Sequence, residues 1–370
     1  MADSRNNLLA LIRSALWGTL PEGLSKDVDW TKIARIAKQQ TLVGLMADGI
    51  AKLPAESRPD EKMMQRLQAY LVRNLQAHML ISSRLADTLD ILRSAGIEPV
   101  LFKGHGLALN YPDPMSRQCG DIDLYIPRAH YDKAVEVCMG HFGKGMHDAE
   151  SVKHYHLENK GVSVELHRIA ETLPGLCANR RYQKWTLMNL ENSELRKVDI
   201  DGVTVSLPPH GFNAIYVMNH AWHHFVVGGI GLRQICDWTV YLHCFHSQLD
   251  HARLEADLKS FGLLKVWHMF AWVAVNKLGL PSEECPLYCG KYAEDAERML
   301  DIIWGDGNFG AYTEGKGVRP EGYSSGKIHS MIVQTKRYFR IMPVHTSHIL
   351  KSWVLYIYLG VYHYIKGLFR

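Results

Sequence analysis

The sequence has few cysteines, and they lack the spacing that marks a cross-linked protein. Seven cysteines occur in 370 residues, an odd number without the pattern of a disulfide framework. This indicates reduced thiols and predicts a cytoplasmic protein. Cys285 and Cys289 form one close pair, but no second pair of the right type lies nearby. The spacing therefore predicts no zinc site around these two cysteines.

Long apolar runs are also missing. The longest apolar segment near the C-terminus, residues 353–365, is shorter than the roughly 18–20 residues that a membrane span needs. It is interrupted by four tyrosines, a glycine and a histidine. We expect a buried helix there and no integral membrane segment. The N-terminus is polar and leads into an amphipathic stretch, so we expect no secretory signal.

A strong excess of one charge is absent as well. The chain has 42 basic and 38 acidic residues, a net charge of +4, which is no strong signal for nucleic-acid binding. No Walker-type glycine-lysine loop occurs. Residues 305–310 match the dinucleotide fingerprint, but they follow a helical pattern where that fingerprint requires a strand. With 47% hydrophobic and 22% charged residues, the composition is that of a folded globular protein.

Hydrophobic periodicity divides the chain into three parts. Residues 1–95 have a helical pattern, residues 96–208 combine strand and helix patterns, and residues 209–370 are helical again. The sequence therefore predicts an α+β protein, in which a small mixed sheet with its own helices is flanked by N-terminal and C-terminal helical regions.

Individual elements can also be predicted. In the first part, we expect one helix from Trp30 to Leu53 with Asp29 as its N-cap, followed by a long helix over residues 60–94. In the middle part, the strand patterns fall at residues 97–102, 121–126 and 203–207, with a hairpin over residues 154–166.

The most informative pattern is the pair Asp121 and Asp123 on an expected strand. Residues two apart on a strand point to the same side, so two carboxylates share one face. Like charges this close repel unless a cation lies between them or one is protonated. Mg²⁺ (or Mn²⁺) suits such oxygen ligands. Glu165 lies on another expected strand among apolar residues, and it joins the pair if the two strands are neighbours. Three converging carboxylates suit metal-assisted phosphoryl-type transfer.

These residues resemble a known family. A strand, a glycine turn, a helix, a strand with Asp-x-Asp and a later strand with a third carboxylate follow the order of the DNA polymerase beta-type nucleotidyltransferase superfamily. More closely, the chain resembles an uncharacterised bacterial nucleotidyltransferase family over most of its length, from about Leu8 to Arg340. The motifs that carry this resemblance are Phe102-Lys103-Gly104, Leu107-Ala108, Tyr111-Pro112, Arg117, Gly120-Asp121-Ile122-Asp123-Leu124 and Glu165-Leu166-His167.

The resemblance implies a minimal polymerase beta-type core and roles for the matched residues. Asp121, Asp123 and Glu165 would be the metal ligands and catalytic residues, with Glu165 either a third ligand or the base for an acceptor hydroxyl. Gly104 would occupy the glycine turn of the superfamily, where backbone amides approach the triphosphate.

The chain departs from the superfamily pattern directly after this turn. The usual sequence is Gly-Ser or Gly-Gly, whereas this chain has Gly104-His105, so a serine hydroxyl that often holds a phosphate is missing. Lys103 as a point charge, or Arg117 in a forked geometry, would supply the contact instead. We therefore expect Lys103, Gly104, His105 and Arg117 to form the nucleotide-binding group. An ordinary strand-end lysine and loop arginine explain Lys103 and Arg117 equally well.

Three further residues are candidates for lining the same site. His167 shares its strand face with Glu165, and His220 lies on an expected helix that resembles one in the family. Asp237 lies four residues after Arg233 on another expected helix. Core packing is the simpler explanation of His220, and a helix ion pair is the simpler explanation of Asp237.

The sequence thus predicts an enzyme that transfers a nucleoside monophosphate from a nucleoside triphosphate (NTP) to an acceptor hydroxyl and releases pyrophosphate. Two alternatives stay open. One is a phosphotransferase that uses the same carboxylates, and the other is a nucleotide- or partner-binding protein without turnover, to which the His105 departure gives weight. The acceptor is equally open among a small molecule, an RNA end and a protein side chain.

Overall fold

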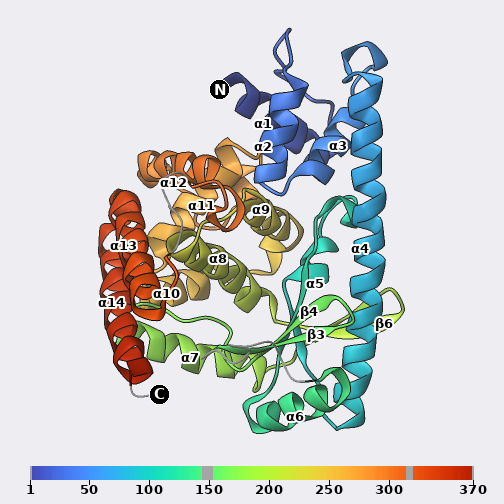
Figure 1. Cartoon of the computed structure of the whole chain (residues 1–370). Helices are drawn as coiled ribbons and strands as arrows, with labels where there is room; N and C mark the ends of the chain where they lie inside the picture. The colour runs from blue at the N-terminus through green and yellow to red at the C-terminus, as the bar shows by residue number, and fades with distance from the viewer. Residues whose placement is uncertain (1, 144–152, 314–319, 369–370) are drawn as a thin grey trace.

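The computed structural model describes residues 2–143, 153–313 and 320–368 (Figure 1). A six-stranded mixed sheet lies among helices that precede and follow it in the chain. The expected α+β class, with helical regions flanking a small mixed sheet, is confirmed.

The N-terminal part consists of helices α1 (Ala2–Trp17), α2 (Trp30–Gln39), α3 (Val43–Ala51) and α4 (Glu61–Ser94). The side chain of Asp29 accepts a hydrogen bond from the backbone N–H of Lys32, so it caps α2 as expected. Asp60 caps α4 in the same way through the N–H of Met63. Helix α4 runs along one side of the molecule (Figure 1).

The single helix expected from Trp30 to Leu53 is wrong, because the chain breaks between α2 and α3. The side-chain amide of Gln40 donates to the carbonyl of Ile303 and accepts from the N–H of Leu232, both in the C-terminal part. Thr41 then adopts a positive φ of 56°. Contacts across more than 190 residues therefore determine where α2 ends.

The sheet has the order β3-β4-β2-β1-β6-β5. The pairs β1/β2, β3/β4 and β5/β6 are antiparallel, whereas β2/β4 and β1/β6 are parallel. The predicted hairpin is present as β3 and β4, and β5 is a strand that the sequence pattern does not predict. The strands are β1 (Val100–Phe102), β2 (Asp121–Tyr125), β3 (His154–Asn159), β4 (Val162–His167), β5 (Arg196–Ile200) and β6 (Val203–Leu207).

Each face of the sheet packs against a different set of helices. Ile122 and Leu124 point into a core that includes Leu85 and Leu89 of α4 and residues of helix α6 (Tyr131–Phe142). On the other face, Phe102 packs against helix α8 (His210–Val227), with its ring 4.4 Å from that of Tyr216. Because strand side chains alternate, Asp121, Asp123 and their neighbours of like parity lie on the α8 side.

The remaining helices complete the two faces and the C-terminal part. They are α5 (Gly104–Ala108), α7 (Leu176–Leu190), α9 (Arg233–Phe245), α10 (His251–Phe261), α11 (Leu264–Asn276), α12 (Ala293–Asp306), α13 (Tyr323–Ile341) and α14 (Thr346–Leu368). The pair α13 and α14 lies on the side of the molecule opposite α4 (Figure 1).

The segment expected to be a buried helix, residues 353–365, belongs to α14 and is partly exposed. Val354, Tyr358 and Tyr362 keep half or more of their surface in contact with solvent. The interpretation as a buried helix is therefore wrong for these positions. Among the helices in the described part of the chain, none has the length and apolar character needed to cross a membrane.

Candidate active site

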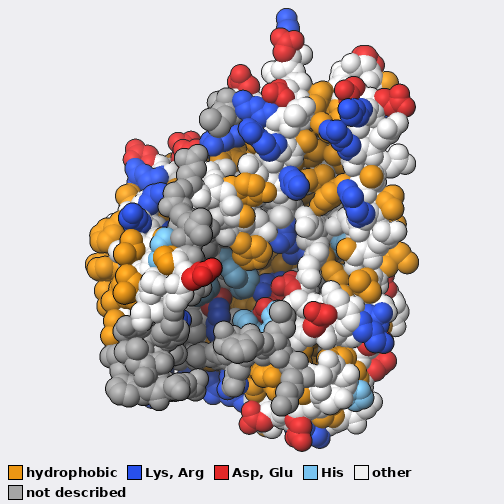
Figure 2. Space-filling model, in the orientation of Figure 1, with side chains coloured by type: hydrophobic (Ala, Val, Ile, Leu, Met, Phe, Trp, Pro, Cys, Tyr) orange, Lys and Arg blue, Asp and Glu red, His pale blue; other side chains and the backbone are white. Residues whose placement is uncertain are grey.

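A cavity of about 460 Å³ opens between the sheet and the C-terminal helices. Its wall combines the turn after β1, residues of β2 and β4, helices α8 and α9, and the turn at Asn308–Gly310. Figure 2 shows this hollow near the centre of the molecule, where histidine and acidic side chains gather. The volume lies within the range of small-molecule sites, roughly 300–1,000 Å³.

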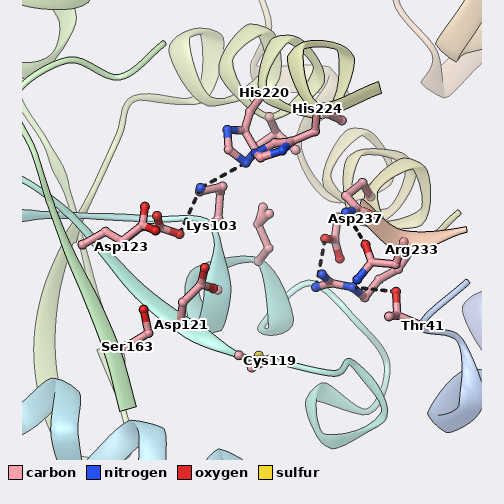
Figure 3. A pocket seen from close by; sticks show the side chains of 18 of the residues that line it. Thr41, Lys103, Cys119, Asp121, Asp123, Ser163, His220, His224, Arg233 and Asp237 are labelled. Atoms are coloured by element: carbon pink, nitrogen blue, oxygen red, sulfur yellow. Dashed lines mark hydrogen bonds and ion pairs between the residues drawn. The ribbon is translucent and has the colours of Figure 1, made fainter. Parts of the chain in front are cut away.

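The three predicted carboxylates line this cavity together. Strands β2 and β4 are parallel neighbours, and their register places Asp123 directly beside Glu165. Asp121 lies two residues before Asp123 on the same face and points into the same hollow (Figure 3). Ile122 and Val164, the residues between, are buried in the opposite core. The apolar and acidic alternation of the strand therefore places the acids at the cavity.

Asp123 is buried, with 2% of its surface exposed, and its two oxygens contact an ammonium group and an imidazole. Its Oδ2 lies 3.0 Å from the Nζ of Lys103, and its Oδ1 lies 2.8 Å from the Nε2 of His167. Burial disfavours the carboxylate, but Lys103 and His167 outweigh burial and lower the pKa of Asp123.

Asp121 lies at the exposed edge of the site and has no ion pair with any described residue. The charge of Asp123, followed by burial, raises the pKa of Asp121 to about 6. A carboxylate that resists ionisation beside another carboxylate is a position where a cation is favourable. The donor set fits a hard divalent ion, because Asp121 and Glu165 offer further oxygen atoms next to Asp123.

Glu165 is bordered by histidines from its own hairpin. Its Oε2 lies 3.2 Å from the Nε2 of His167 and 3.5 Å from the Nδ1 of His154. These three residues offer ligand atoms that all lie within 4.8 Å of one another. The hydrogen bond with His167 lowers the pKa of Glu165 although burial opposes it. His167 thus contacts two of the three acids, which matches its predicted place at the site.

Lys103 connects the acids to α8. Besides its contact with Asp123, its Nζ lies 3.1 Å from the Nε2 of His220 (Figure 3). Burial, followed by Lys103, lowers the pKa of His220 well below its usual value. Because a neutral imidazole nitrogen accepts from an ammonium group, the Nδ1 of His220 carries the proton, and this atom faces Glu171 at 3.4 Å.

Gly104 is the residue at which the chain turns from β1 into α5. It has a φ of +43°, and a Cβ built on it would lie 3.4 Å from the backbone oxygen of Asp121. A side chain there would strain the backbone, because this φ favours glycine. The turn therefore lies in van der Waals range of the carboxylate strand, and an approach of its backbone amides to a triphosphate stays a prediction.

Comparison with known proteins gives one family match and one similar solved structure. The profile of a family described as uncharacterised nucleotidyltransferase matches residues 26–279. The chain belongs to this family. A solved structure of an antigenic nucleotidyltransferase-like protein from Paracoccidioides brasiliensis is similar over 58% of this chain and 94% of its own, with 17% identity and a TM-score of 0.33. No curated protein matches the chain.

Two residues expected at the nucleotide have other partners in this nucleotidyltransferase family member. Arg117 donates from Nε and Nη2 to the two carboxylate oxygens of Asp237, at 2.7 and 2.9 Å, and its Nη1 lies 3.0 Å from the sulfur of Cys119. Arg117 lines the cavity, but its guanidinium is already held by these partners, so its role as the phosphate contact stays a prediction. Asp237 borders the cavity, but its carboxylate is held by Arg117 and by the hydroxyl of Tyr111.

His105 is the second of the two residues that were expected at the nucleotide. Its side chain is buried and packs against His78, with ring centroids 5.0 Å apart, and it is not among the residues that line the cavity. The expectation that His105 contacts the nucleotide is therefore not supported. The imidazole of His105 belongs to a different cluster, with His78 and Cys119.

The family member also has site residues that the sequence reasoning missed. Glu171 is fully buried, and it contacts Lys153 at 2.9 Å and the Nδ1 of His223 at 3.5 Å. Arg233 was interpreted only as the partner of Asp237, yet it also lines the cavity and donates to the backbone oxygen of Gln118 at 2.9 Å. In the sequence, Glu171 is a lone glutamate in an apolar stretch, and this pattern could have indicated a buried acid.

Proposed function

We propose that the protein is a metal-dependent nucleotidyltransferase that moves a nucleoside monophosphate from an NTP to an acceptor hydroxyl and releases pyrophosphate. The observation that carries this proposal is the convergence of Asp121, Asp123 and Glu165 on one face of the sheet, beside the glycine turn at Gly104. Membership of the nucleotidyltransferase family supports the same reaction class.

The three carboxylates would hold Mg²⁺ or Mn²⁺. When bound, such an ion supplies charge neutralisation for phosphate oxygens and makes an acceptor hydroxyl a better nucleophile. The fit rests on Asp121, which has no ion pair with any described residue and whose pKa is raised by the charge of Asp123. Glu165 is the third ligand in this proposal, and His167 orients it together with Asp123.

The other residues of the cavity would bind and orient the substrates. Lys103 is the cation nearest to the acids, and its ammonium group suits a triphosphate oxygen once a metal ion balances Asp123. Arg233 lies across the cavity, where its guanidinium can hold a second anionic group. Gly104 lets the chain turn close to the phosphates, since it carries no side chain.

The first prediction tests the transfer with labelled nucleotide. The full-length protein is incubated with Mg²⁺, each α-labelled NTP and cell lysate, and the lysate is then separated into small molecules, RNA and protein. We expect transfer of label to one of these pools. Asp121→Asn/Asp123→Asn is expected to lower the rate at least about a hundredfold. Glu136→Gln, at an exposed position of α6, is the matched control and should transfer at the wild-type rate.

Folding and alternative reactions are separated in the same experiment. Asp123 repels Asp121 without metal, and Asp121→Asn alone leaves the contacts of Asp123 with Lys103 and His167 in place. This single variant is therefore expected to lose transfer activity and to melt no lower than the wild type in a chelator. Transfer from a γ-labelled but not an α-labelled NTP contradicts the proposal and assigns a phosphotransferase. Wild-type-specific NTP binding without any transfer in lysates from several sources assigns a binding protein instead.

A further inference from the structure

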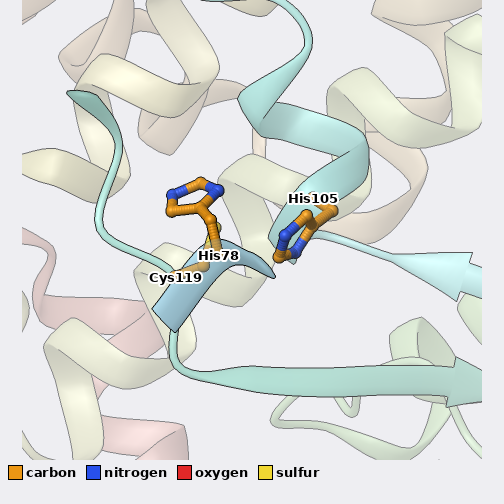
Figure 4. A group of neighbouring side chains, drawn as sticks. All are labelled: His78, His105 and Cys119. Atoms are coloured by element: carbon orange, nitrogen blue, oxygen red, sulfur yellow. The ribbon is translucent and has the colours of Figure 1, made fainter. Parts of the chain in front are cut away.

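A second group of potential metal ligands lies beside the cavity, outside the carboxylate site. It consists of His78 on α4, His105 on α5 and Cys119 on the segment before β2 (Figure 4). All three are buried, with exposed fractions of 1%, 5% and 7%. Their ligand atoms lie within 4.8 Å of one another. Three segments of the chain thus contribute two imidazoles and one thiol to one small space.

Each imidazole has one buried nitrogen without a hydrogen bond to a nitrogen or oxygen atom of the described residues, and the thiol of Cys119 lies beside both rings. These buried atoms are Nδ1 of His78 and Nε2 of His105. A buried polar atom without a hydrogen bond costs about 1–3 kcal/mol. A metal ion bound by both nitrogens removes this cost, because it accepts the lone pair of each nitrogen.

The surroundings of His78 fix which nitrogen can bind a metal. Its Nε2 lies 2.6 Å from the backbone oxygen of Arg117. A carbonyl oxygen only accepts hydrogen bonds, so Nε2 carries the proton and Nδ1 carries the lone pair. Histidine ligands of metal ions are oriented by this kind of hydrogen bond from the other ring nitrogen.

The charge near Cys119 is compatible with a bound cation. Nη1 of Arg117 lies 3.0 Å from the sulfur and can donate a hydrogen bond to a thiolate. The positive charge of Arg117 is balanced by Asp237, whose carboxylate oxygens accept hydrogen bonds from the other two guanidinium nitrogens. The arginine therefore supports a thiolate ligand without leaving an uncompensated positive charge against the metal.

We propose that His78, His105 and Cys119 bind a zinc ion. Two imidazoles and a thiolate are a ligand set that zinc prefers, with Zn–S of about 2.3 Å and Zn–N of about 2.0–2.1 Å. On binding, the thiol releases its proton to solvent and the sulfur forms the bond to the metal. The fourth position takes water, because Cys119 also lines the cavity.

The zinc ion ties the glycine turn to the segment that leads into the carboxylate strand β2. His105 follows Gly104 of the phosphate turn, and Cys119 lies two residues before Asp121. The site is distinct from Cys285 and Cys289, around which the sequence predicts no zinc, and its existence does not depend on the proposed reaction.

The second prediction uses Co²⁺ alone as a probe of the metal-free, reduced full-length protein. We expect a thiolate-to-cobalt absorption band in the near ultraviolet that saturates at one equivalent and disappears when Zn²⁺ is added. Cys119→Ser should lose this band, and His105→Ala should weaken cobalt binding at least about tenfold. Cys289→Ser is the matched control, since its sulfur also contacts a histidine, His268, and it should keep the band.

X-ray absorption of zinc-loaded Cys289→Ser protein supports or overturns the proposal even where Cys119→Ser fails to fold. One sulfur and two or more nitrogen or oxygen neighbours support the site. A purely nitrogen and oxygen environment overturns it, as does a cobalt band that Cys119→Ser retains. The absorption band needs no nucleotide, so its outcome is separate from success or failure of the transfer assay.

Discussion

Lys103 has a backbone conformation that lysine rarely adopts. Its φ of 47° and ψ of −134° lie in a region where a residue with a side chain is strained, at a cost of about 1–3 kcal/mol. The surrounding contacts hold it there, with its ammonium group between Asp123 and His220. A glycine would remove the strain but also the cation. The lysine is thus retained at a position that its own backbone disfavours, which is consistent with a role in the site.

The third prediction concerns Lys103→Met, which keeps the length and the strained backbone but removes the charge. Asp123 loses its ion pair with Lys103 and keeps only the contact with His167, so we expect the free energy of unfolding in a chelator to fall by about 1–3 kcal/mol. Mg²⁺ should then stabilise the variant more than the wild type, while NTP binding weakens. Urea unfolding with and without Mg²⁺ measures both effects. Lys197→Met, at an exposed ion pair, is the control. If Mg²⁺ raises the free energy of unfolding equally in the variant and the wild type, Lys103 is not the counter-ion of Asp123.

At the residue scale, the sequence predicts the acids but not their partners. Asp121 and Asp123 could be placed on one face because strand periodicity is a local property. Glu165 joined them only through the pairing of β2 with β4, which no local pattern specifies. The ion pair between Arg117 and Asp237 was not predictable from local patterns, because the two residues are 120 positions apart in the sequence.

At the scale of elements, Arg117 and Asp237 join the segment before β2 to helix α9. Both side chains are 4% exposed, and two hydrogen bonds connect them. Breaking a buried pair by removing one charge leaves the other uncompensated. We therefore expect this pair to hold the segment before β2 against α9.

The fourth prediction is that Asp237→Asn lowers the free energy of unfolding at pH 7 by about 3–5 kcal/mol. Burial opposes ionisation of Asp237, but Arg117 outweighs it and lowers the pKa of Asp237. The stabilisation is thus fully present above the unfolded-state pKa of about 3.9 and is lost as the pH falls through the lower folded-state value. Urea unfolding from pH 7 downward should show the two proteins converging in acid.

A surface pair is the matched control for this comparison. Asp301→Asn removes the partner of Arg5, and Asp301 is 74% exposed, so we expect a change below about 1 kcal/mol. If Arg117→Met instead weakens NTP binding while leaving stability unchanged, Arg117 is a nucleotide contact after all. Measuring both stability and NTP binding therefore decides whether Arg117 serves the ion pair with Asp237 or contacts the nucleotide, as the sequence predicts.

Elements were predictable where the local pattern was complete. The hairpin of β3 and β4 and the strand β6 have clear alternation next to turn residues. Strand β5 was missed because it is an edge strand whose residues, Arg196–Ile200, are mostly polar and partly exposed. The break after α2 was missed because Gln40 finds its partners in the C-terminal part.

At the scale of the whole molecule, the cavity belongs to all three parts of the chain. Thr41 comes from the N-terminal part, the acids from the sheet, and His220, Arg233 and Phe309 from the C-terminal part. The core on one face of the sheet also continues into α8, where the rings of Phe102 and Tyr216 meet. The division into residues 1–95, 96–208 and 209–370 therefore follows hydrophobic periodicity. It does not by itself make residues 96–208 a unit that folds alone.

The fifth prediction tests with two fragments whether residues 96–208 fold alone. Residues 96–208 lack both α4, which covers one face of the sheet through Leu85 and Leu89, and α8, which covers the other. We expect this fragment to show no cooperative thermal unfolding, because both apolar faces are exposed to water. A longer fragment, residues 61–245, restores both covers and is expected to recover a cooperative transition by circular dichroism. Cooperative unfolding of the short fragment, with dispersed amide resonances, would instead make the sheet an autonomous domain on which the helical regions are additions.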